Sequence, residues 1–72
     1  MTTYLLHTCT LESAEVSALN VRTRREGLDV SFVAATAEET QIAFSASRKG
    51  DKAASKAALE LFMELKRRGW KE

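Results

Sequence analysis

The sequence lacks the residues that most often stabilise a very small protein. Among its 72 residues it has one cysteine, Cys9, and one histidine, His7, so it cannot form an internal disulfide or a zinc site built from several Cys and His ligands. A chain this short also buries a smaller share of its surface than a larger domain does. We therefore expect no metal or other cofactor, and a thin core that a partner subunit could supplement.

Long apolar runs are missing as well. No segment approaches the roughly 20 consecutive apolar residues that span a bilayer, and the N-terminus does not join a basic region to an apolar one as a secretory signal does. With a single cysteine, this favours a reducing, cytoplasmic location and no membrane partner. The net charge is only +1, so any attraction to a polyanion must come from the arrangement of the charges.

Proline is absent and glycine is scarce, which leaves no recognisable linker. The chain has no Gly/Ser-rich stretch, no internal repeat and no low-complexity segment. Its three glycines, Gly27, Gly50 and Gly69, stand where turns or helix ends are expected. Residues 1–72 are therefore predicted to form a single domain.

What the sequence does contain, between residues 28 and 47, is the alternating pattern of two β-strands. Apolar and polar side chains alternate along both halves of this segment. A loop at 37–39 would join strands 28–36 and 40–47 into a hairpin with one apolar face. In the predicted register Ala34 pairs with Ile42, Phe32 with Phe44 and Val30 with Ala46.

Residues 14–25 fit two interpretations. The side chains alternate between Leu19 and Thr23 as they would in a strand, whereas the acidic segment 12–15 is also typical of the start of a helix. The dipeptide Glu26-Gly27 favours the strand, because a two-residue turn at that point would pair it with the strand that follows.

The C-terminal segment from Asp51 to Arg68 is the clearest helix. Its apolar residues recur at the 3.6-residue period of one helix face, and Gly69 is placed to end the helix. The residues that form this face are Ala54, Ala57, Ala58, Leu61 and Leu65.

These segments together predict an α+β fold. With Tyr4–Thr10 as a further strand at an edge, the preferred arrangement is an antiparallel β-sheet of 3–4 strands with one C-terminal α-helix packed on one face. The element order is then β-β-β-β-α. If residues 12–25 are helical instead, the order is β-α-β-β-α.

The predicted topology gathers basic residues at one end of the domain. The segment that leads into Gly27 and the segment that follows Ser47 both lie at the end where strand 28–36 begins. This basic pole consists of Arg22, Arg24, Arg25, Arg48, Lys49, Lys52 and Lys56. Lysines in the first turn of a helix oppose its dipole, a cost that phosphate binding would explain. We therefore predict a small nucleic-acid-binding module that contacts phosphates through the basic pole.

The C-terminal half resembles the double-stranded RNA-binding domain. In that family a strand leads through a basic Ser-Lys-Lys-type segment into an alanine-rich helix, and the matching residues here are Ser47-Arg48-Lys49 and the run from Lys52 to Leu59. The resemblance implies that Arg48, Lys49 and Lys52 contact phosphates across a major groove. It covers about 40 residues. The segment 24–27 stands in place of the family's minor-groove loop but lacks its Gly-Pro-x-His motif, and the N-terminal segment reads as a strand where the family has a helix.

A second set of residues suggests binding to protein. Leu59, Phe62 and Met63 lie away from the apolar face of the C-terminal helix, and with Trp70 they would form an exposed apolar stripe. Such a stripe predicts an interface, most simply of a homodimer. The alternative function is therefore a stand-alone protein-interaction module, such as a small inhibitor or adaptor encoded by a phage or mobile element. It would use the stripe, or the basic pole, against a partner protein.

No constellation typical of an enzyme is present. His7 and Cys9 would share one face of a strand, but no further catalytic group accompanies them. The adjacent Glu38 and Glu39 would diverge on a strand and do not form a carboxylate dyad. We therefore predict a protein that is not an enzyme.

Overall fold

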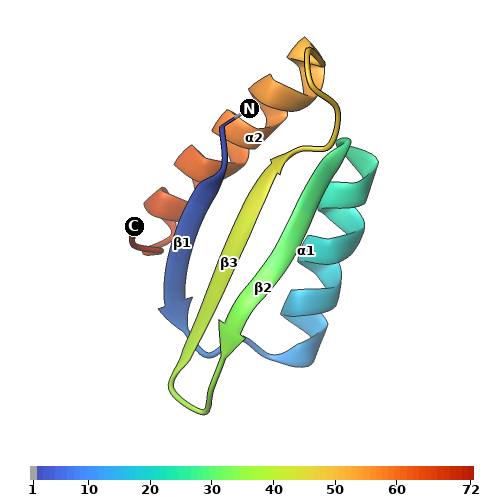
Figure 1. Ribbon diagram of the computed structural model, residues 1–72. Coiled ribbons are helices and arrows are strands. Elements are labelled where there is room, and N and C mark those ends of the chain that lie inside the picture. The colour runs from blue at the N-terminus through green and yellow to red at the C-terminus, as the bar shows by residue number, and fades with distance from the viewer. Residues whose placement is uncertain (1) are drawn as a thin grey trace.

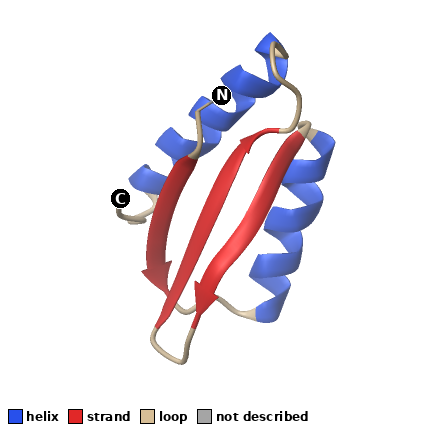
Figure 2. Cartoon of the chain, viewed as in Figure 1, coloured by secondary structure: helices blue, strands red, loops and turns tan. Residues whose placement is uncertain are grey.

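The computed structural model describes residues 2–72, and in this part of the chain two helices cover one face of a three-stranded sheet (Figures 1 and 2). The elements follow one another as β1 (Tyr4–Cys9), α1 (Ser13–Arg25), β2 (Leu28–Ala35), β3 (Glu39–Ala46) and α2 (Lys52–Arg67). The strands lie in the order β1-β3-β2, and β3 is antiparallel to both neighbours. α1 therefore connects two strands that do not pair with each other.

The antiparallel sheet and the C-terminal helix are confirmed, but the preferred order β-β-β-β-α is wrong. The structure has the alternative order, β-α-β-β-α, because residues 13–25 form a helix. Leu19 and Thr23 are buried one helical turn apart, and the Thr23 hydroxyl donates a hydrogen bond of 2.8 Å to the Leu19 carbonyl. Val21, which a strand would place on the same face as these two, is 54% exposed.

The hairpin of β2 and β3 is confirmed, in a register different from the predicted one. Phe32 lies opposite Ile42 and Val30 opposite Phe44, so each partner is shifted by two residues. A bulge between Phe32 and Ala34 changes the register again toward the loop. The hydroxyl of Thr36 closes that loop by accepting hydrogen bonds from the amides of Glu38 and Glu39.

α2 supplies the largest part of the core. The Asp51 side chain accepts a hydrogen bond of 3.0 Å from the Ala54 amide and caps the start of the helix. The buried face then repeats every three or four residues and rests on β3 and β1. Its members are Ala54, Ala58, Leu61 and Leu65, which pack with Leu6, Leu19, Leu28, Ile42, Phe44, Ala46 and Trp70.

The chain after α2 folds back against β1. Gly69 has a φ of 102°, which only glycine adopts readily, and the Trp70 amide then donates to the Leu65 carbonyl. Lys71 and His7 exchange two backbone hydrogen bonds of 2.7 and 2.8 Å at the outer edge of β1. This return places the Trp70 side chain in the core, where it is 5% exposed.

Candidate functional site

Two segments far apart in the sequence meet at one end of the molecule. The turn after α1 and the loop before α2 are joined at Gly27, whose carbonyl accepts hydrogen bonds from the amide and the hydroxyl of Ser47, at 2.9 and 2.7 Å. Gly27 has a φ of 73°, and a Cβ at this position would lie 3.6 Å from the Cβ of Ala54 in the first turn of α2. The C-terminal end of α1 and the N-terminal end of α2 are therefore neighbours (Figure 1).

Six of the seven residues of the predicted basic pole project from these segments. They are Arg24 and Arg25 at the end of α1, Arg48 and Lys49 in the loop, and Lys52 and Lys56 in the first turns of α2. We call them the basic cluster. All six are exposed, and within residues 2–72 none of them forms an ion pair. Their charges are thus uncompensated by direct contacts within the described chain.

Arg22, the seventh residue, lies in the same last turn of α1 but is paired with carboxylates. Its guanidinium donates two hydrogen bonds to the carboxylate of Glu64 in α2, at 2.5 and 3.1 Å, and its Nε lies 3.6 Å from Glu26. The hydrogen bonds with Glu64 raise the pKa of Arg22 above its usual value and lower that of the Glu64 carboxyl. Arg22 therefore links the two helices. A phosphate could bind Arg22 only by competing with the carboxylates of Glu64 and Glu26.

This pair gives a prediction for stability as a function of pH. Because the pKa of Glu64 is lowered in the folded state, the pair contributes its full stabilisation above the ordinary value of 4.5 and loses it as the pH falls through the lower, folded value. Both side chains are partly exposed, so Glu64→Gln should lower the free energy of unfolding at pH 7 by only about 0.5–1 kcal/mol. Urea unfolding at pH 7 and pH 3 should show that the difference in unfolding free energy between wild type and variant is smaller in acid.

The matched control is Glu60→Gln, which makes the same chemical change at an exposed position of the same helix. Glu60→Gln should lower the free energy of unfolding at pH 7 by less than Glu64→Gln does. An equal loss in the two variants would show that the Arg22 contact adds nothing to stability.

The start of α2 already carries its own anion. The carboxylate of Asp51 takes the position at which a bound phosphate would accept a hydrogen bond from the Ala54 amide. Phosphate contact at this end therefore depends on the exposed side chains of the basic cluster and not on the backbone amides.

The predicted apolar stripe is divided between the surface and the core. Leu59 and Met63 are 45% and 52% exposed on α2. Phe62 is only partly exposed, because its ring packs on that of Tyr4 with centroids 4.7 Å apart. Trp70 is buried in the core. Two of the four residues, Leu59 and Met63, are thus about half exposed, and Trp70 does not belong to a surface stripe.

Several titratable side chains meet at the end of β1, where His7, Cys9, Glu38 and Glu39 line one open hollow. Nδ1 of His7 lies 3.5 Å from a carboxylate oxygen of Glu39, and Cys9 is exposed at the end of β1. Within residues 2–72 no group of three or more His, Cys, Asp or Glu side chains is placed to hold a metal ion. The same part of the chain contains no helix with the length and apolar character needed to cross a membrane.

Comparisons with known proteins identified no relative of this chain. No protein-family model matches the chain, and neither curated proteins nor solved structures gave a significant match.

Sequence reasoning missed the link between Arg22 and Glu64. The spacing of Arg22 and Glu26 along one helix face was the available signal that Arg22 would be paired.

Proposed function

We propose that the protein binds nucleic acid through the phosphate backbone, with the basic cluster as its contact surface. The observation that carries this proposal is that two distant segments bring six exposed basic side chains, none of them in an ion pair, to one end of the described chain. The nearby carboxylates of Glu26 and Asp51 are engaged by Arg22 and by the Ala54 amide. The local positive charge is therefore left to interact with an external anion.

The chemistry of the cluster favours backbone contact over sequence recognition. Arginine and lysine neutralise phosphates and release counterions, and this attraction is independent of base sequence. Aromatic side chains that stack on unpaired bases are missing from the cluster, so we expect a duplex to bind at least as well as a single strand. The partial resemblance to the double-stranded RNA-binding domain supports the same preference through Arg48, Lys49 and Lys52.

The test is a salt titration of binding to duplex RNA and duplex DNA. The triple variant Arg48→Ala, Lys49→Ala, Lys52→Ala should lose about tenfold or more in affinity at 50 mM salt. The slope of log K against log salt should become shallower by about 2.7, since each lost phosphate contact removes roughly 0.9. Fluorescence anisotropy with a labelled duplex measures both quantities.

A matched variant removes the same charge from the opposite end of α2. Arg67→Ala, Arg68→Ala, Lys71→Ala also deletes three exposed basic side chains, about 20 Å away along the helix. It should keep most of the affinity. If both triple variants weaken binding equally, the attraction is due to net charge and the basic cluster is not a site. Absence of binding at low salt would refute the proposal outright.

Protein binding through the outer face of α2 is the second candidate function. Leu59 and Met63 are half exposed there, with Lys52 and Lys56 on the same side of the helix. An acidic partner with an apolar centre would match this surface. Binding of such a partner should be lost with Met63→Asp and should respond less to Arg48→Ala, Lys49→Ala, the reverse of the pattern expected for nucleic acid.

A further inference from the structure

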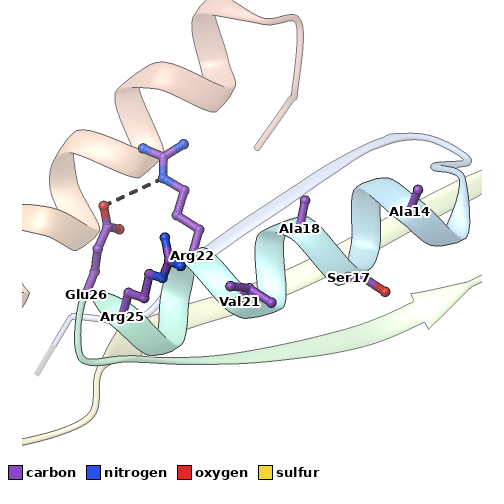
Figure 3. A pocket seen from close by; sticks show the side chains of 7 residues that line it. All are labelled: Ala14, Ser17, Ala18, Val21, Arg22, Arg25 and Glu26. Carbon is purple, nitrogen blue, oxygen red and sulfur yellow. Dashed lines mark ion pairs between the residues drawn. The ribbon is translucent and has the colours of Figure 1, made fainter.

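Arg22 lies among the basic residues at the end of α1, but its guanidinium is occupied. It belongs to the same last turn as Arg24 and Arg25, and Arg25, three residues later, is its neighbour on the helix surface. Arg22 and Arg25 line the same open hollow, together with Glu26 (Figure 3). Arg22 is therefore placed beside the basic cluster, and its pairing with Glu64 withdraws it from that cluster.

The carboxylate that occupies Arg22 comes from the other helix. The Arg22 guanidinium donates two hydrogen bonds to Glu64, and these bonds join α1 to α2. The planar fork of a guanidinium matches the two oxygens of a carboxylate in the same way as it matches two oxygens of a phosphate. Glu64 thus takes, within the protein, the position on Arg22 that a nucleic-acid phosphate would take.

Arg22 has a second acceptor within reach, on its own helix. Glu26 follows one turn later, and its Oε1 lies 3.6 Å from Nε of Arg22 (dashed line in Figure 3). The other oxygen of Glu26, Oε2, is buried, and within residues 2–72 no group donates a hydrogen bond to it. A buried oxygen without a hydrogen bond is costly, so Glu26 favours a position of Arg22 closer to itself. A guanidinium has five N–H donors, so Arg22 in that position still has donors for a phosphate.

We propose that Glu64 is an internal competitor of nucleic acid for Arg22. Released from Glu64, the Arg22 side chain rests against Glu26 and becomes a seventh phosphate contact beside Arg25. In the wild type a nucleic acid gains little from Arg22, because the hydrogen bonds that it would make replace bonds that the protein already has. The contact between Arg22 and Glu64 therefore limits the affinity of the basic cluster. This inference rests on the proposed function, because it concerns the regulation of the same surface.

The test compares two variants that remove one carboxylate each from α2. Glu64→Gln releases Arg22, and at 50 mM salt it should bind a labelled DNA duplex about threefold to tenfold more tightly than the wild type does. The slope of log K against log salt should become steeper by about 0.9, the value for one added phosphate contact. Fluorescence anisotropy measures both quantities.

Glu60→Gln is the matched control. It removes the same charge one turn nearer the start of α2, from an exposed side chain that forms no ion pair within residues 2–72. It releases no arginine, so it measures the effect of charge alone. Glu60→Gln should strengthen binding by less than about twofold and leave the salt slope unchanged.

A double-mutant cycle assigns the gain to Arg22. Arg22→Gln alone should weaken binding by no more than Glu60→Gln strengthens it, because Arg22 is already neutralised in the wild type. The double variant Arg22→Gln, Glu64→Gln should lose the whole gain of Glu64→Gln and bind like the wild type. All three variants should keep the circular dichroism spectrum of the wild type, since both side chains are partly exposed.

The outcomes separate this inference from the proposed function. If the wild type binds duplexes but Glu64→Gln binds no more tightly than Glu60→Gln, Glu64 is not a competitor and this inference alone is overturned. A gain that persists when Arg22→Gln is added also overturns it, because the added affinity then does not come from Arg22. If neither the wild type nor Glu64→Gln binds at low salt, the proposed function is refuted and this inference with it.

Discussion

Leu61→Ala is expected to lower the free energy of unfolding by about 3 kcal/mol. Leu61 is 0% exposed in the middle of α2, where it packs with the central strand, so truncation removes apolar contacts and leaves a cavity that neighbouring side chains fill only in part. A small domain has a total stability of only about 5 kcal/mol or somewhat more, so this loss would remove a large share of it. Urea unfolding followed by circular dichroism at 222 nm measures the change.

Leu59→Ala is the matched control for this experiment, because it makes the same substitution two residues earlier on the same helix. Leu59 is 45% exposed, so little apolar surface returns to water, and we expect a cost below about 0.5 kcal/mol. If Leu61→Ala and Leu59→Ala lower the free energy of unfolding equally, α2 does not bury the face that contains Leu61.

Trp70→Ala is also expected to lower the free energy of unfolding by about 3 kcal/mol. Trp70 is 5% exposed in the core, its amide is hydrogen-bonded to Leu65, and the backbone of Lys71 is hydrogen-bonded to His7. Because Trp70 is the only tryptophan, unfolding can be followed by its fluorescence in the wild type. The variant is followed by circular dichroism.

Lys71→Ala separates the role of the indole from that of the tail. The Lys71 side chain is exposed, and its contribution to the structure is through the backbone bonds with His7, which alanine can also make. It should change stability by less than about 0.5 kcal/mol. If Trp70→Ala leaves stability unchanged but abolishes self-association, Trp70 belongs to an interface, as the sequence suggested, and not to the core.

The elements that sequence reasoning placed well are those whose apolar residues keep one period over a long stretch. α2 repeats its buried face over about three turns, and apolar and polar residues alternate along β3 and along β2 as far as Phe32, so both types of element were predictable. The register of the hairpin was not, because a shift of two residues keeps every side chain on its own face. Only the loop closed by Thr36 and the bulge after Phe32 decide between the two pairings.

The error at α1 has a specific cause. Leu19 and Thr23 are four residues apart, a spacing that places them on one side of either a helix or a strand. Val21 between them decides the matter, and its exposure is a property of the folded protein that its apolar side chain does not reveal. The gathering of basic residues was nevertheless predictable, because a strand or a helix that leads into Gly27 ends at the same end of the sheet. Arg22 was an exception, since only the packing of α1 beside α2 brings it to Glu64.

The central position of β3 also sets the order in which the chain can assemble. β2 and β3 need only a short loop to pair, whereas Cys9 and Glu39, the partners in β1 and β3 that are nearest in sequence, are separated by 30 positions. Closing a longer loop costs more chain entropy, and distant pairings slow folding. During synthesis β1 emerges from the ribosome first, but it cannot pair until β3 has been synthesised. We therefore expect the hairpin to gain protection from hydrogen exchange before β1 does in refolding experiments.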